Sequence, residues 1–263
     1  MIPLLTNPKV SVVIPAYNHE KFIRAAVDSV LQQSHANVEL IVVDVGSTDQ
    51  TGRIVQSYKD PRVTYFYQEN QDAYNALNQG LSMATGKFIA ILNSDDIYHP
   101  NRLERCLRVH RRTRAAAIFS DVQPLDAEGN PFRDPNFWWT QWHERNRQYY
   151  FKYKDLYTAF LHGNFMVTTS NLFMTAQAAR KVGKFADLRY LHDYDYIFRL
   201  MCAFPRKVAY LDREKLIFYR LHGGNTISDA AIKGREEDKQ VIRKYLLKKI
   251  PHALQPVATT GVD

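Results

Sequence analysis

Two adjacent carboxylates, Asp95 and Asp96, come soon after the apolar run at 88–92, with only Asn93 and Ser94 between. An apolar run of this length between polar flanks predicts a buried strand. Two like charges at the end of such a strand repel each other unless a cation or hydrogen-bond donors hold them. Carboxylates together with substrate phosphates are the usual ligands of Mg²⁺ in enzymes. The pair therefore predicts a metal site or, alternatively, a cap of the helix expected to begin at Pro100.

A further carboxylate, Asp193, stands at the start of a predicted helix. In that helix Tyr196, Ile197 and Leu200 are spaced to form one buried stripe. A carboxylate at this position is stabilised by the helix dipole, so capping alone would account for Asp193. The sequence pattern around Asp193 therefore does not by itself assign a catalytic role to this residue.

The elements of the first half alternate between strands and amphipathic helices. Strands are predicted at 10–14, 38–45, 63–67 and 87–92, and helices at 21–33, 50–58, 73–84 and 100–112. This alternation predicts an α/β fold with a doubly wound, mostly parallel sheet.

Polar residues follow each of the four predicted strands, and ligands of such sheets bind beyond the carboxyl ends of the strands. Tyr17 and Asn18 follow the first strand, Asp44 ends the second, and Asp72 comes after the third. Neither a G-x-G-x-x-G nor a G-x-x-x-x-G-K-[ST] sequence is present, which disfavours a Rossmann dinucleotide enzyme and a P-loop enzyme.

The second half is less regular. Residues 132–157 contain all three tryptophans among interleaved arginines and lysines. Such a segment could stack on sugars or bases, settle at a membrane interface, or form the core of a subdomain. A strand-like run at 166–174, a helix at 176–182 and a last strand at 216–221 follow. A basic helix and tail are expected from residue 229 onward.

Composition indicates a soluble globular protein of 263 residues, with 45% hydrophobic and 24% charged residues. We expect a cytoplasmic protein, because no secretory signal and no membrane-length apolar run are visible. Two cysteines are too few for a disulfide framework. The net charge of +8 is clustered at 101–114 and 239–250. Such clusters suit phosphates, nucleic acid or anionic lipid, or are simply solvated helix faces.

Taken together, the motifs resemble the family 2 glycosyltransferases, which have the GT-A fold. Six pieces carry the resemblance in order: VVIPAYN at 12–18, IVVDVGSTD at 41–49, QENQDAYNALNQG at 68–80, ATGK at 84–87 leading to NSDD at 93–96, HDYD at 192–195, and YRLHGGN at 219–225. The resemblance implies a glycosyltransferase domain at 1–228, with a nucleotide-sugar half at about 8–122 and an acceptor half, a smaller subdomain, at about 123–228. Residues 229–263 would be the basic helix and tail.

The resemblance also implies an activity and a set of site residues. Members of the family transfer a sugar from a nucleotide diphosphate to an acceptor hydroxyl with inversion. Asp193 would be the catalytic base, and Asp95 would bind Mg²⁺ or Mn²⁺. His222 would reach that ion or the diphosphate, or else bond to the backbone of its turn. The nucleotide sugar would contact Pro15, Ala16, Tyr17, Asn18, Asp44, Asp72, Asn75, Ser94, Asp95 and Arg220.

Three positions depart from the family pattern. Val45 stands where a second acid is common, Asn93 replaces the first acid of the D-x-D motif, and His192 replaces a glutamate before the base. None of these removes a required group, but each leaves the donor open among UDP-, dTDP- and GDP-sugars.

The acceptor is expected to be a saccharide or a lipid-linked oligosaccharide, as in the synthesis of surface polysaccharides. The basic clusters are compatible with peripheral contact at the inner membrane face. Two other classes compete: a nucleotidyltransferase, and a non-catalytic protein that binds nucleic acid or an anionic surface. For the glycosyltransferase, no nucleic-acid partner is expected.

Overall fold

The structure is a computed structural model that describes residues 7–69, 72–132, 134–223 and 235–246. Its centre is an eight-stranded sheet with the order β3-β2-β1-β4-β7-β6-β8-β5. The first four strands run parallel to one another. Their bounds are Val10–Ala16 for β1, Val38–Asp44 for β2, Val63–Tyr67 for β3 and Phe88–Ile91 for β4.

Helices cover both faces of this parallel part. The bounds are Ile23–Leu31 for α1, Thr51–Gln56 for α2, Ala73–Met83 for α3 and Arg102–Thr113 for α4. On one face Val27 and Val30 of α1 share a hydrophobic core with Val12 of β1. On the other face Leu77 of α3 packs with Val13. Gly80 allows this close packing, because a β-carbon there would collide with the Val13 side chain.

The second half extends the sheet with antiparallel and parallel strands. The bounds are Ile97–Tyr98 for β5, Ala117–Leu125 for β6, Phe173–Thr175 for β7 and Val208–Arg220 for β8. β7 lies antiparallel between β4 and β6, while β8 runs parallel to β6. The expected α/β class is confirmed. The expected parallel arrangement holds for β1 to β4, and the whole sheet is mixed because β7 and β5 pair antiparallel with their neighbours.

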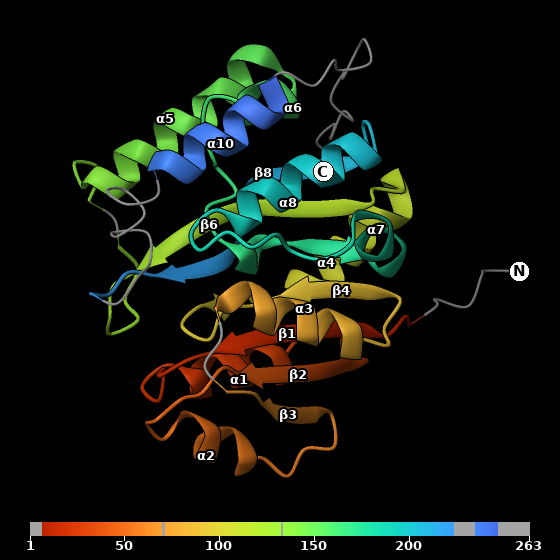
Figure 1. The fold of residues 1–263 in the computed structure, drawn as a ribbon, viewed down its shortest axis with the longest axis vertical. Coiled ribbons are helices and arrows are strands. Elements are labelled where there is room, and N and C mark those ends of the chain that lie inside the picture. Colours follow the sequence, from red (N-terminus) through yellow and green to blue (C-terminus); the bar gives the residue numbers. More distant parts are fainter. Residues whose placement is uncertain (1–6, 70–71, 133, 224–234, 247–263) are drawn as a thin grey trace, which may run out of the picture.

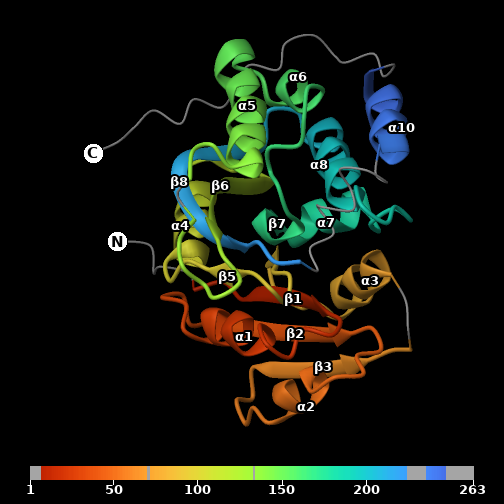
Figure 2. The ribbon, with the colours of Figure 1, turned by 90° about the vertical axis from the view of Figure 1, so that its left-hand side faces the viewer.

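The remaining helices gather at one end of the molecule, away from α2 and β3 (Figures 1 and 2). They are α5 (Trp138–Tyr153), α6 (Leu156–Phe160), α7 (Ala176–Val182), α8 (His192–Ala203) and α10 (Arg235–Leu246), with the short 3-10 helix η1 at Thr169–Asn171. α10 packs on α8, since Val241 and Tyr245 are buried in the same core. The expected boundary at 228/229 lies outside the described residues, and β6 runs across the expected division at 122/123.

Two strands differ from their predicted bounds. β1 continues through Pro15 to Ala16, because its pairing with β4 stops at Val13. Pro15 has no backbone N–H to donate, but at Pro15 the strand edge that faces β4 has no partner strand, so no hydrogen bond is lost. β8 begins at Val208 instead of residue 216, and a bulge opposite Asp121 interrupts its pattern. The predicted strand at 166–174 is instead η1 followed by the three-residue β7.

The arginine cluster on α4 is partly used inside the fold. Arg102 is fully buried, and its guanidinium donates to the backbone carbonyl of Asn171 at 2.8 Å. Arg105 pairs with Glu214 of β8 at 2.6 Å. These contacts tie α4 to the second half, so the cluster is only partly a solvated face. Within the described part of the chain, none of the helices has the length and apolar character needed to cross a bilayer.

Candidate active site

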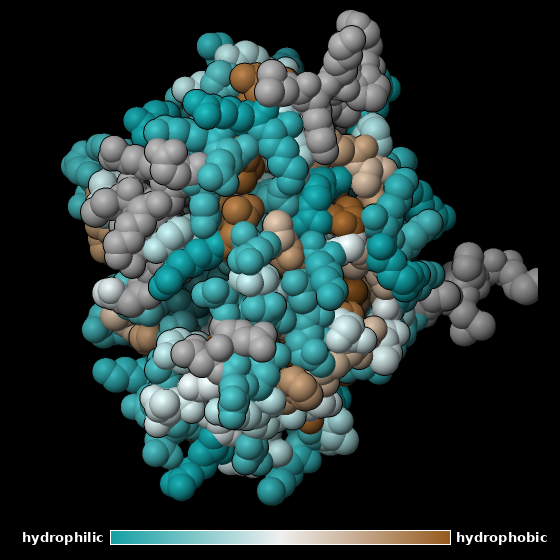
Figure 3. Space-filling model, viewed as in Figure 1, coloured by the Kyte–Doolittle hydropathy of each residue, from teal (hydrophilic) through white to brown (hydrophobic). Residues whose placement is uncertain are grey.

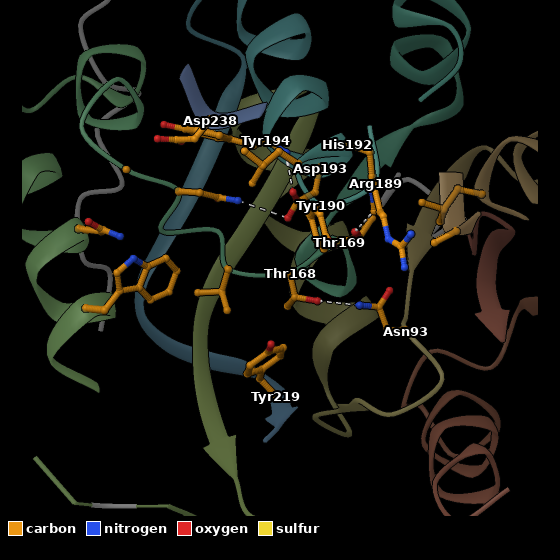
Figure 4. Close-up of a pocket in the computed structure, with 18 of the residues that line it drawn as sticks. Asn93, Thr168, Thr169, Arg189, Tyr190, His192, Asp193, Tyr194, Tyr219 and Asp238 are labelled. Carbon is orange, nitrogen blue, oxygen red and sulfur yellow. Dashed lines mark hydrogen bonds between the residues drawn. The ribbon is translucent and has the colours of Figure 1, made fainter. Parts of the chain in front are cut away.

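A cleft of about 1540 Å³ opens between the strand ends of the first half and the helices of the second. Tyr17, Asp72 and Asp95 line it from the first half, and Trp142 and Asp193 line it from the second. The two carboxylates expected to do the chemistry thus share one cavity. Figure 4 shows the Asp193 side chain pointing into the cleft from α8, toward the side that Thr168 and Tyr219 line.

Asp95 lies in a cluster with two histidines. Its Oδ2 is 3.0 Å from Nε2 of His222, which follows the end of β8. His19, in the loop after β1, completes the group, and one ligand atom from each residue lies within 4.8 Å of the others. A carboxylate and two imidazoles are suitable ligands for a divalent metal ion. The predicted site residues Asp95 and His222 therefore come together, and His19 was not predicted.

The pKa values of Asp95 and His19 are both shifted in the direction that favours metal binding. Burial would raise the pKa of Asp95, but the hydrogen bond with His222 and the charges of His19 and His222 hold it below the ordinary value. Burial lowers the pKa of His19, and His222 lowers it further, while the charge of Asp95 acts in the opposite direction. An ionised carboxylate and a neutral imidazole are the forms that bind metals.

Asp96, although adjacent, has a different role. It is completely buried, and its carboxylate accepts hydrogen bonds from Ser170 Oγ at 2.5 Å, Thr168 Oγ1 at 3.2 Å and the Arg220 backbone N–H at 3.0 Å. Burial and the charge of Asp95 raise its pKa well above the ordinary value. Asp96 therefore joins η1 and β8 to the loop after β4. The capping interpretation of the pair is wrong, because α4 has Asn101 at its N-cap and no side-chain cap.

Asp193 is buried in the first turn of α8. Its Oδ1 accepts the Tyr194 backbone N–H at 2.7 Å, and Asn164 donates to its Oδ2 at 3.4 Å. Burial raises the pKa of Asp193, although His192 and these two donors act against the increase. His192 itself contacts Thr169 Oγ1 at 3.2 Å. The carboxylate is therefore a stronger base than an exposed aspartate and is held facing the cleft.

The residues predicted to bind the nucleotide base lie in loops that are joined by hydrogen bonds. Pro15, Ala16 and Tyr17 line the cleft. Asn18 has a left-handed backbone (φ 49°), and its Oδ1 accepts the Thr48 backbone N–H at 2.8 Å. This bond ties the loop after β1 to the loop after β2.

Asp44, at the end of β2, is buried and makes two local hydrogen bonds. Its carboxylate accepts Tyr65 Oη and the Ser47 backbone N–H, each at 2.8 Å. A carboxylate has about four acceptor positions, so these contacts leave capacity for another donor. Asp72, exposed at the start of α3, lines the cleft, whereas Asp44 is not among its lining residues.

Of the remaining residues predicted to contact the nucleotide sugar, only Ser94 lines the cleft. Ser94 lines the cleft and its Oγ lies 2.7 Å from His19 Nδ1. Asn75 lies in the first turn of α3 and is not among the lining residues. Arg220 is buried, and its guanidinium donates to the backbone carbonyls of Asp95 and Ala127, each at 3.0 Å. The structure thus places Arg220 where it supports the loop that carries Asp95.

One face of α5 lines the cleft, and the sequence did not specify which residues it would present. The lining residues share helical spacing, and they are Trp138, Gln141, Trp142, Arg145, Asn146 and Tyr149. Trp139, by contrast, is buried in the core and stacks on Tyr219. Part of the aromatic segment therefore belongs to the core, as one of the three interpretations predicted, and another part lines the cavity.

Comparisons with known proteins bear directly on this site. The sequence model of Glycosyl transferase family 2 matches residues 11–175. An uncharacterised glycosyltransferase of Rickettsia typhi is 31% identical over 255 residues, which cover 93% of this chain and 73% of the relative. The chain belongs to glycosyl transferase family 2. Family membership favours a glycosyltransferase over the nucleotidyltransferase and the non-catalytic binder.

Solved structures show the same fold. The structure of TarS (residues 1–349) from S. aureus in complex with UDP-GlcNAc has a TM-score of 0.70 and 18% identity, and the match covers 92% of this chain and 68% of TarS. A mannosyltransferase from Pyrobaculum calidifontis in complex with GDP-Man and Mn²⁺ has a TM-score of 0.64 and 17% identity, with 94% and 67% coverage. The expected GT-A fold is confirmed.

Proposed function

We propose that this glycosyltransferase is an inverting, metal-dependent enzyme that moves a sugar from a UDP-, dTDP- or GDP-sugar to an acceptor hydroxyl. The observation that carries the proposal is that Asp95 and Asp193, far apart in the chain, line the same cleft from the first and second halves of the fold. Inverting transfer needs a leaving-group site and a base on opposite sides of the sugar, and two carboxylates that share one cleft support such a mechanism.

The leaving-group side is the cluster around Asp95. Asp95 and His222 would hold Mn²⁺ or Mg²⁺, and the donor set of one carboxylate with neighbouring imidazoles fits such an ion. When bound, the ion neutralises the charge that develops on the leaving diphosphate. Arg220 supports this side by donating to the Asp95 backbone carbonyl.

The opposite side is Asp193, which would accept the proton of the incoming hydroxyl. A positioned general base contributes roughly 10²- to 10⁴-fold to a rate. Burial raises the pKa of Asp193 and so brings it closer to neutral pH, where a base is most effective. Asn164 and the Tyr194 N–H orient the carboxylate.

The donor and acceptor would occupy the two ends of the cleft. TarS and the mannosyltransferase from Pyrobaculum calidifontis, which share the fold, were solved with UDP-GlcNAc and with GDP-Man, and this supports a nucleotide-sugar donor beside Tyr17 and Asp72. At the other end Trp138 and Trp142 offer aromatic faces beside the amide of Gln141, a combination that suits a saccharide. We therefore favour an acceptor in surface polysaccharide or lipid-linked oligosaccharide synthesis.

Peripheral contact with an anionic membrane belongs to the same proposal. The basic surface that remains on α4 after the internal contacts of Arg102 and Arg105 supports it. The face of the molecule in Figure 3 is mostly hydrophilic, with hydrophobic residues only in small separate groups. The proposed contact is electrostatic, because the residues that support it are the basic residues of α4.

Replacing Asp193 with asparagine tests the catalytic assignment. Asp193→Asn should lower transfer to a saccharide acceptor by at least about 10²-fold, because the proton acceptor is lost. Nucleotide-sugar affinity, measured by calorimetry, should stay within a few-fold of the wild type. Asp238→Asn is the matched variant, because Asp238 is another carboxylate that lines the cleft. Loss of transfer in Asp238→Asn with normal transfer in Asp193→Asn would show that the base is misassigned.

A further inference from the structure

We propose that His19 is a third protein ligand of the metal ion. Together with Asp95 and His222 it would form a set of two imidazoles and one carboxylate. This set would bind Mn²⁺ without the nucleotide and in preference to Mg²⁺. The inference rests on the proposed metal dependence and adds a ligand from a part of the chain expected to hold only the nucleotide base.

The distances within the cluster suit a single ion. His222 Nε2 and Asp95 Oδ2 lie 3.0 Å apart, and the full set lies within 4.8 Å. In an octahedral site with bonds of about 2.1 Å, neighbouring ligand atoms are about 3.0 Å apart and opposite ones about 4.2 Å apart. The three side chains therefore need to close by only a fraction of an ångström to contact the same ion.

Three separate elements bring the ligands together. His19 follows β1, Asp95 follows β4, and His222 follows β8. The carboxyl ends of β1 and β4 lie at the same edge of the sheet because these strands are parallel neighbours. An ion held by all three would link the loop after β1, including Tyr17, to the catalytic half of the molecule.

The contacts of the His19 ring favour binding through one defined nitrogen. Ser94 Oγ lies 2.7 Å from Nδ1, so Nε2 is the ring nitrogen that would reach the ion. Hydrogen bonds of this kind at the second ring nitrogen orient metal-binding histidines. The ring also packs edge-on against Phe22 and His222, with centroids 5.8 Å and 5.6 Å away. These contacts hold the imidazole in place before an ion arrives.

The ligand set determines the preferred metal. Mg²⁺ favours oxygen ligands, keeps several waters and is usually held by one or two carboxylates with substrate phosphates. Imidazole ligands instead favour transition-metal ions. A site with two imidazoles and one carboxylate is therefore expected to bind Mn²⁺ more tightly than Mg²⁺ when no diphosphate is present to supply oxygens.

A purely structural role for His19 is the competing interpretation, and His19→Asn separates the two. The asparagine amide reaches about as far as Nδ1 of histidine, so it can keep the hydrogen bond to Ser94 while removing the distal nitrogen. His35→Asn is the matched control. His35 bonds to the Pro8 carbonyl, just before the start of β1, whereas His19 follows the end of that strand.

Calorimetric titration with MnCl₂ alone, at matched thermal stability, is the first test. His19→Asn should weaken Mn²⁺ binding by about 10-fold or more, since even indirect contacts to metal ligands are worth 10- to 100-fold in affinity. His35→Asn should bind as the wild type does, and Asp95→Ala should lose binding. If His19→Asn binds Mn²⁺ with wild-type affinity while Asp95→Ala loses binding, His19 is not a ligand, and the proposed metal site of Asp95 and His222 is unaffected. Equal binding by wild type and Asp95→Ala would refute the proposed metal site itself.

A second measurement does not depend on the folding of a variant. Crystals of the wild type soaked in MnCl₂ should give an anomalous peak within about 2.3 Å of a His19 ring nitrogen, a normal metal–nitrogen distance. A peak that contacts only Asp95 and His222 would overturn the proposal. A parallel MgCl₂ titration should show weaker binding than MnCl₂, and equal affinities would contradict the predicted selectivity.

Discussion

The two aspartates of the HDYD sequence are buried two positions apart, yet their environments differ. Asp195 pairs with Arg199 and Lys244, each at 2.7 Å. Burial would raise the pKa of Asp195, but these partners and Tyr245 hold it below the ordinary value. Among the described residues Asp193 has no ion pair, and burial raises its pKa. The structure therefore identifies Asp195 as a structural anchor, and this difference favours Asp193 as the proposed base.

This difference predicts how stability depends on pH. A carboxyl group whose pKa is raised in the folded state favours folding below its unfolded pKa, about 3.9, and this contribution is lost as pH rises through the folded value. At pH 7 the wild type therefore carries an unfavourable buried charge that Asp193→Asn removes. The variant should be more stable than the wild type in urea unfolding at pH 7, and the difference should disappear below about pH 4. A lower urea midpoint for the variant at pH 7 would contradict this account.

Neighbouring residues also show the limit of reading the site from sequence. Asp95 and Asp96 are equivalent in the sequence pattern, since both follow a buried strand. Only the contacts distinguish them, because Asp96 accepts three hydrogen bonds from η1 and β8 while Asp95 faces the histidines. Those partners lie more than 70 positions away in the chain. Local sequence could suggest a metal site for the pair, but not which of the two would face the histidines or which neighbours would hold the other.

At the scale of elements, the first half was predictable because the hydrophobic residues of each element follow either the strand pattern or the helix pattern throughout. The bounds of β3 at 63–67 and the start of α3 at Ala73 agree with the prediction. β8 was only half predicted, because the charged segment at its bulge, residues 212–214, hides the strand pattern. Here Arg213 adopts a left-handed backbone, and its N–H donates to Asp121 of β6 at 2.7 Å. The path of β8 through its bulge therefore depends on this contact with β6, which the local sequence does not reveal.

Helix α5 shows the same limit for the site. Its amphipathic pattern is blurred by aromatic residues on several sides, so the sequence could not assign Trp139 to the core and Trp142 to the cleft. The fold assigns them because Trp139 stacks on Tyr219 and His143, in the core between α5 and β8. Only the assembled fold shows which face of α5 lines the cleft.

The cleft face of α5 leads to a prediction about the acceptor. Trp142→Ala should raise the acceptor KM by about fivefold or more, since truncating a buried aromatic contact commonly costs over 1 kcal/mol. The donor KM should change little, because Trp142 lies on the second-half wall of the cleft. Phe151→Ala is the control: Phe151 is an exposed aromatic residue on the same helix and does not line the cleft. Initial rates with each substrate varied would check both, and equal acceptor effects in the two variants would argue against a specific α5 contact.

At the scale of the whole molecule, the two halves are joined directly behind the cleft. β7 pairs with β4, and Asp96 connects the loop after β4 to η1 and β8. The loops proposed to bind the nucleotide base belong to one half together with Asp95, and Asp193 and α5 belong to the other. A donor held through a metal ion by Asp95 and His222 would therefore contact both halves, and its binding energy would be added to the stability of the whole fold.

Thermal unfolding can measure this coupling and identify the donor. At 100 times its dissociation constant a ligand adds about 2.7 kcal/mol of stability. For a domain near this size that corresponds to a rise in Tm of roughly 5–10 °C. Among UDP-, dTDP- and GDP-sugars, the true donor should produce this rise with Mn²⁺ and a smaller one with EDTA.

In Asp95→Ala the difference between Mn²⁺ and EDTA should disappear, because the carboxylate proposed to bind the ion is gone. Sugar nucleotides should then give the same small rise under both conditions, through the loops around Tyr17 and Asp72 alone. A rise that is equally large with EDTA in the wild type would mean that the halves are bridged by direct contacts to the diphosphate, and metal dependence would have to be abandoned. Stabilisation by nucleoside triphosphates in place of nucleotide sugars would instead indicate nucleotidyl transfer at this site.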